Sequence, residues 1–89
     1  MHEASLMSGL MTKLESLARE QHAKRVKRVR VRLGALSHFS AEHFREHFEH
    51  ASRGTLAEHA LLDIELSTDI ADPRAQDVVL ESFDVEVAG

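Results

Sequence analysis

The chain has 89 residues, 43% of them hydrophobic and 29% charged, which suits one small folded domain and argues against disorder. It contains no cysteine, which excludes disulfides, thiolate nucleophiles and cysteine-based zinc or iron–sulfur sites. No apolar run approaches the roughly 20 residues of a membrane span, and no signal peptide precedes the domain, so we expect a cytoplasmic protein without a membrane partner.

The net charge of −4 is unevenly distributed. Residues 1–54 carry ten Lys and Arg against six Asp and Glu, whereas residues 55–89 carry one against nine. The basic stretch from Lys24 to Arg32 has no aromatic residue within it on which a nucleic-acid base could stack. Nucleic-acid binding is therefore not expected.

The first three residues, Met1-His2-Glu3, have the composition of a metal chelate. A histidine at position 2 offers one ion three nitrogens, namely the α-amine, its own backbone amide and its imidazole. This near-planar nitrogen set suits Ni(II) or Cu(II). The amine has an ordinary pKa of roughly 7.7–8.0 and deprotonates readily near neutrality. The alternative is a frayed terminus without function, and these residues alone leave it open.

Residues 4–22 predict an amphipathic helix. Its expected apolar stripe consists of leucines three or four residues apart, widened by two methionines: Leu6, Leu10, Leu14, Leu17, Ala18, Met7 and Met11. Gly9 costs about 1 kcal/mol relative to alanine and indicates close packing or a soft spot.

Residues 26–33 predict a strand, because valine and leucine alternate there with Arg28, Arg30 and Arg32. Val26 is out of phase, so we expect a bulge or the start of the strand near Lys27. A second helix is predicted from Ser40, as N-cap, to about Ser52, with Gly54 as its stop. Phe44, Phe48 and Ala51 form its buried stripe.

Three histidines, His43, His47 and His50, lie beside that stripe at spacings of four and three. Histidines at i and i+4 can share one ion, so the trio is a secondary candidate for a metal or interaction site. The simpler interpretation is a polar helix flank that happens to use histidine, because no cysteine or convergent carboxylate accompanies the three.

The rest of the chain predicts two strands, residues 61–68 and 78–87, joined by a loop at residues 69–76. Leu56 is expected to fill the core between the second helix and the second strand. In the last strand we expect Val79, Phe83, Val85 and Val87 to face inward.

The predicted fold class is α/β, of the two-layer α+β kind, in the order helix-strand-helix-strand-strand. Two helices should cover one face of a three-stranded mixed sheet, with the first two strands parallel. The arginines of the first strand would meet the acidic residues of the other two if it were central, which favours the order 2-1-3. The order 1-2-3, in which neighbours in sequence pair, remains the alternative.

Five segments carry a resemblance to a known family: Met1-His2-Glu3, residues 29–37 (VRVRLGALS), residues 52–58 (SRGTLAE), residues 62–65 (LDIE) and residues 83–87 (FDVEV). In order and spacing they resemble the HypA/HybF family of hydrogenase maturation nickel chaperones. The resemblance implies one small domain over residues 1–89, with nickel held by Met1, His2 and Glu3. It also implies a HypB-type GTPase and a nickel-enzyme precursor, such as a hydrogenase large subunit, as partners.

This chain departs from the family in one large respect. Family members insert a zinc domain with two Cys-x-x-Cys pairs between the last two strands, where this chain has only residues 69–76. No residue here can inherit the zinc-ligand role, so no zinc is expected. The first hypothesis is a non-enzymatic Ni(II) metallochaperone. The second is an interaction or accessory module, or a homo-oligomer, that keeps the fold without nickel delivery. An enzyme is not expected, because no nucleophile–base pair or phosphate-binding loop is present.

Overall fold

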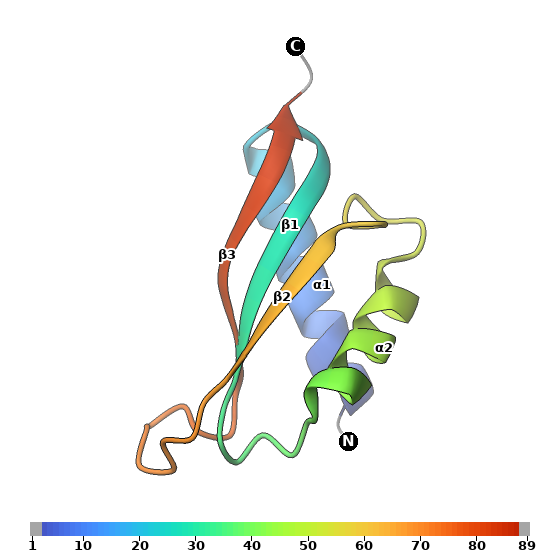
Figure 1. Ribbon diagram of the computed structural model, residues 1–89. Helices are drawn as coiled ribbons and strands as arrows, with labels where there is room; N and C mark the ends of the chain where they lie inside the picture. The colour runs from blue at the N-terminus through green and yellow to red at the C-terminus, as the bar shows by residue number, and fades with distance from the viewer. Residues whose placement is uncertain (1–2, 88–89) are drawn as a thin grey trace.

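The computed structural model describes residues 3–87 and shows two helices and three strands in the predicted order (Figure 1). The three strands form one sheet in the order β2-β1-β3, in which β1 runs parallel to β2 and antiparallel to β3. The fold class and the strand order 2-1-3 are therefore confirmed. The elements are α1 Glu3–Glu20, β1 Ala23–Leu33, α2 Ala41–Ser52, β2 Leu61–Leu66 and β3 Val78–Val87.

The central place of β1 agrees with the charges on the open face of the sheet. Arg28 Nη1 lies 2.7 Å from Asp63 Oδ2 on β2, and Arg30 Nε lies 3.6 Å from the same oxygen. On the other side, Arg32 Nη1 lies 3.5 Å from Glu81 Oε2 on β3. A central basic strand between two acidic ones replaces like-charge neighbours with cross-strand pairs of opposite charge.

Three irregularities shift the register between β1 and β3, and the first lies between Ala23 and Arg25. In β1 the register shifts between Val26 and Arg28, so the bulge expected near Lys27 is present and Val26 is buried. In β3 the register shifts where Arg30 pairs with Ser82 but Val31 pairs with Leu80. The shifts between Ala23 and Arg25 and around Glu81 were not predicted.

The shift at Glu81 makes part of the predicted inward face of β3 wrong. Val78, Leu80, Phe83 and Val85 pack against the core, and Val79 is not among the core residues. Val87, also expected inward, is 55% exposed. One extra residue in a strand moves every side chain before it to the opposite face, which a strict alternation cannot anticipate.

The core lies between the two helices and the apolar face of the sheet, and both helices lie on that side (Figure 1). From α1 it takes Met7, Leu10, Met11, Leu14 and Ala18. The prediction for Leu6 was wrong: its side chain is 43% exposed, whereas that of Met7 is 4% exposed. The buried stripe of α1 is therefore rotated by one position from the leucine stripe, towards the methionines.

Helix α2 begins where the sequence predicts. The N-cap Ser40 accepts a hydrogen bond at its Oγ from the His43 backbone amide, at 3.1 Å, which satisfies one of the free donors of the first turn. Phe44 and Phe48 are almost fully buried against the sheet. Beyond the helix, Gly54 has a φ of 78°, and Leu56 packs against the core as predicted.

At the end of the sheet opposite the α1–β1 connection, the loop between β1 and α2 contacts the loop between β2 and β3. β2 stops at Leu66, two residues earlier than predicted, although the Ser67 amide still donates to the Leu33 carbonyl at 2.9 Å. The Leu36 amide, in the loop before α2, donates to the Ala75 carbonyl, in the loop before β3, at 2.7 Å.

None of the helices in residues 3–87 is long and apolar enough to cross a membrane.

Candidate functional site

Met1 and His2, the first two predicted nickel ligands, lie outside the described residues. Of Glu3, the structure describes the backbone, which is the first residue of α1. The start of a helix presents free N–H groups and the positive end of the helix dipole, which favours carboxylates. The ligand role of Met1, His2 and Glu3 therefore stays a prediction.

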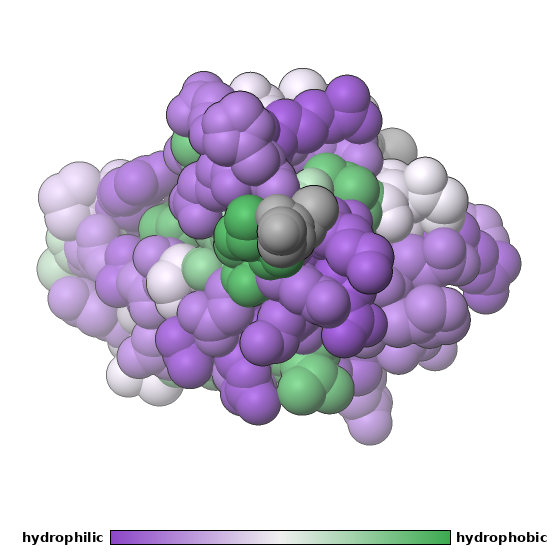
Figure 2. Space-filling model, turned by 90° about the horizontal axis from the view of Figure 1, so that it is seen from above, coloured by the Kyte–Doolittle hydropathy of each residue, from purple (hydrophilic) through white to green (hydrophobic). Residues whose placement is uncertain are grey.

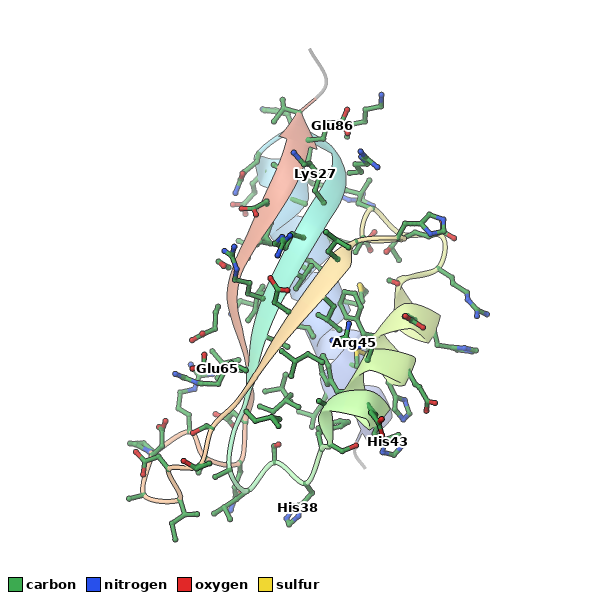
Figure 3. The ribbon with its side chains drawn as sticks, viewed as in Figure 1. Lys27, His38, His43, Arg45, Glu65 and Glu86 are labelled. Carbon is green, nitrogen blue, oxygen red and sulfur yellow. The ribbon has the colours of Figure 1, made fainter. Side chains whose placement is uncertain are left out.

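The start of α1 lies at the same end of the molecule as the start of α2 (Figure 1). Figure 3 shows His43 at this end, together with His38 of the preceding loop, while Glu86 and Lys27 lie at the opposite end of the sheet. The fold thus has the start of α1 and the first of the α2 histidines at one end.

The α2 histidines are only partly brought together. His43 and His50 are exposed and His47 is half-buried. The ring centres of His43 and His47 lie 4.7 Å apart, with an angle of 55° between the ring planes. Phe39 packs edge-on against His47, with ring centres 6.5 Å apart, and against Phe44, with ring centres 5.5 Å apart. Phe39 therefore supports one side of His47, a role that its place in a loop did not indicate.

A groove of about 640 Å³ runs between α1 and α2. Its base is apolar and its rim carries carboxylates and imidazoles; the lining includes Met7, Met11, Ala51, Glu15, Glu46, His47 and His50. Sequence reasoning missed this groove, because nothing in the spacing of either helix says which residues of the other it faces.

Within residues 3–87, no group of three or more His, Asp or Glu side chains is arranged to hold a metal ion. The opposite end of the molecule, where β3 finishes, is mostly hydrophilic with small apolar patches (Figure 2). There Arg25 donates to Glu86 and, with its charge, holds the pKa of Glu86 below its usual value. The arrangement is an ion pair of the open sheet face.

The structure defines a small two-layer α+β domain, and comparisons with known proteins place it in a family. A family model described as hydrogenase/urease nickel incorporation, metallochaperone, hypA, matches residues 1–72. The hydrogenase maturation factor HypA of Methylocella silvestris is 44% identical over 66 residues, which are 74% of this chain and 58% of that protein. That of Archaeoglobus fulgidus is 40% identical over 74 residues, 83% of this chain and 66% of that protein. The chain belongs to the HypA family.

Solved structures of the family share the fold. The Ni metallochaperone HypA from Helicobacter pylori superposes with a TM-score of 0.81 at 21% identity, covering 99% of this chain and 100% of that one. A second HypA structure gives a TM-score of 0.75, also at 21% identity. At this identity the likeness shows the fold alone. The chain spans less than two thirds of the length of the HypA proteins from Methylocella and Archaeoglobus.

Proposed function

We propose that this protein is a nickel carrier that binds one Ni(II) through Met1, His2 and Glu3 and passes it to the precursor of a [NiFe] hydrogenase or another nickel enzyme. The observation that carries the proposal is the match to a nickel-incorporation metallochaperone family over residues 1–72, which include these three residues. A HypB-type GTPase and a hydrogenase large subunit are the proposed partners, in the cytoplasm. The family description is that of a metallochaperone, so nickel is cargo here and no catalytic residue is assigned.

The donor set suits this cargo. The amine of Met1, the amide of His2 and its imidazole give nitrogen ligands in two fused chelate rings, an arrangement that Ni(II) accepts in its planar geometry. The carboxylate of Glu3 supplies negative charge beside the ion. No cysteine is available for a thiolate-based zinc site, and we propose that residues 69–76 stand where longer relatives insert their zinc domain.

Calorimetric nickel titration tests the proposal. Addition of one residue before Met1 displaces the amine, and His2→Ala removes the imidazole, so both changes should abolish tight binding. His59→Ala is the matched control and should leave affinity unchanged, since His59 lies in the connection before β2. Equal loss in His2→Ala and His59→Ala would contradict the amino-terminal assignment. So would tight binding that survives His2→Ala but is lost when His43, His47 and His50 are all replaced by Ala.

The pH dependence offers a second test. Binding needs a neutral amine and a neutral imidazole, with ordinary pKa values of about 7.7–8.0 and 6.5, and the amide must also release a proton. Nickel affinity should therefore fall steeply from about pH 7.5 to 6, because more than one proton is released for each ion bound. A carboxylate site would hold its affinity over this range, because Asp and Glu stay ionised down to roughly pH 4–5.

A second candidate function is an interaction or accessory module that keeps the fold without nickel delivery, with a second copy of the chain as one possible partner. The observation in its favour is the short connection between β2 and β3, residues 67–77, which contains no cysteine for the zinc-ligand role that the resemblance assigns to longer relatives. Absence of nickel binding in both the unextended and the extended chain would select this function.

A further inference from the structure

We propose a second, weaker metal site on α2, in which the imidazoles of His43 and His47 bind one first-row divalent ion and water completes its coordination. The inference is independent of the proposed nickel function, because it uses neither Met1 nor His2. It rests on the spacing of the two residues, the geometry of their rings, the support of His47 by Phe39 and the charge of α2.

The ring geometry fits an ion shared by two imidazoles. An imidazole nitrogen binds such an ion at roughly 2.0–2.1 Å, so two rings that meet it at a right angle have centres about 4.5 Å apart. The centres of His43 and His47 lie 4.7 Å apart. Because χ2 of histidine is a broad torsion, rotation about it can aim one nitrogen of each ring at a shared ion. Imidazole is a good ligand for nickel, copper and zinc alike.

The surroundings favour one place for the site. Edge-on packing of Phe39 limits where the half-buried ring of His47 can lie, so less conformational freedom is lost when an ion binds. The exposed ring of His43 keeps the ion open to water. The N-terminal dipole of α2 opposes a cation, but Glu42 on the first turn and Glu46 on the rim of the α1–α2 groove bring opposite charge.

Because the site has only two protein ligands, it binds an ion weakly and reversibly. It is consistent with the lack of any group of three or more ligating side chains in residues 3–87. The pair lies at the end of the molecule where α1 begins (Figures 1 and 3).

Nickel titration in the His2→Ala background tests the inference, since the amino-terminal chelate is then disabled. We expect one residual weak site, and the added changes His43→Ala and His47→Ala should weaken it by more than roughly tenfold, the lower range of losses caused by removing even an outer partner of a metal ligand. His22→Ala with His59→Ala is the control and should leave it unchanged. A residual site that is insensitive to His43 and His47, or no residual site, overturns the inference.

A register swap separates this pair from other pairs on the helix. Glu42→His with His43→Gln keeps the number of histidines but places the two rings five residues apart, on different sides of α2. The residual site should be lost; if it persists, the His47–His50 pair carries it and the assignment to His43 is wrong. Two variants of the unchanged chain distinguish this inference from the proposed function. If replacing His43 and His47 abolishes all nickel binding while His2→Ala has no effect, the proposed function is refuted and this inference stands.

Discussion

The two faces of β1 are stabilised by different kinds of interaction. Towards the helices, Val26, Val29 and Val31 are almost fully buried in the core. Towards solvent, Arg25, Arg28 and Arg32 form ion pairs with acidic residues of both neighbouring strands. Burial of each apolar side chain stabilises the fold by kilocalories per mole. Each exposed ion pair contributes from tenths of a kilocalorie to about one kilocalorie per mole. The buried face therefore supplies most of the stability, and the charged face selects which strands are neighbours.

The largest expected effect comes from breaking the buried face. Phe48→Ala should lower the free energy of unfolding by about 3–5 kcal/mol, because it removes a nearly fully buried ring and leaves a cavity. Urea denaturation measures the loss. Phe39→Ala, at a half-buried position, should cost clearly less; an equal or larger loss there would contradict the expectation that the extent of burial sets the cost.

A smaller effect is expected where the sheet meets its loops. A Cβ on Gly34 would lie 2.1 Å from the Ala75 carbonyl oxygen, so the backbone of one segment must move, and Gly34→Ala should destabilise by about 1–3 kcal/mol. The matched control is Gly9→Ala on α1, where nothing lies within 4 Å of the added carbon. That change should stabilise by about 0.5–1 kcal/mol from helix propensity. Effects of the same sign in the two variants would contradict this difference in packing.

Much of this fold could be read from the sequence because its two strongest signals act locally. The alternation of Val and Arg over residues 28–33 identifies β1 and, through charge, its central position. Ser40 and Gly54 bound α2 through the chemistry of helix ends. The bulge at Glu81 and the burial of Met7 in place of Leu6 could not be read, since both depend on what lies opposite in the folded chain.

The candidate sites divide in the same way. Met1, His2 and Glu3 can be interpreted as a chelate because the donors are neighbours in sequence, and their role as nickel ligands stays a prediction. The spacing of His43 and His47 gives a possible pair, but only the structure shows their rings together with Phe39 beside one of them. The α1–α2 groove depends on helix packing and has no signal in either helix alone.

On the charged face, Asp63→Asn should cost about 0.5–1 kcal/mol, because Asp63 accepts from Arg28 and also lies near Arg30, and all three side chains are substantially exposed. The loss should shrink in high salt, where exposed charges are screened. A double-mutant cycle with Arg28→Gln isolates the pair. A loss above about 2 kcal/mol that is insensitive to salt would mean that the charged face stabilises the fold as much as the buried face does, which would contradict the difference expected between them.

The smallest effect is expected at Glu86, the partly exposed partner of Arg25, and it should depend on pH. The hydrogen bond and charge of Arg25 lower the pKa of Glu86 in the folded protein. A lowered folded-state pKa means that folding favours the carboxylate, so the contribution is fully present above the unfolded-state value of about 4.3 and is lost as pH falls through the folded-state value. Wild type should therefore be slightly more stable than Glu86→Gln at pH 7, and the difference should vanish as the carboxylate is protonated below pH 4. Urea midpoints of the two proteins between pH 7 and 3 measure this, and Arg25→Gln should abolish the same dependence. A difference that stays constant or grows with acid would mean that Glu86 acts through packing and not through its charge.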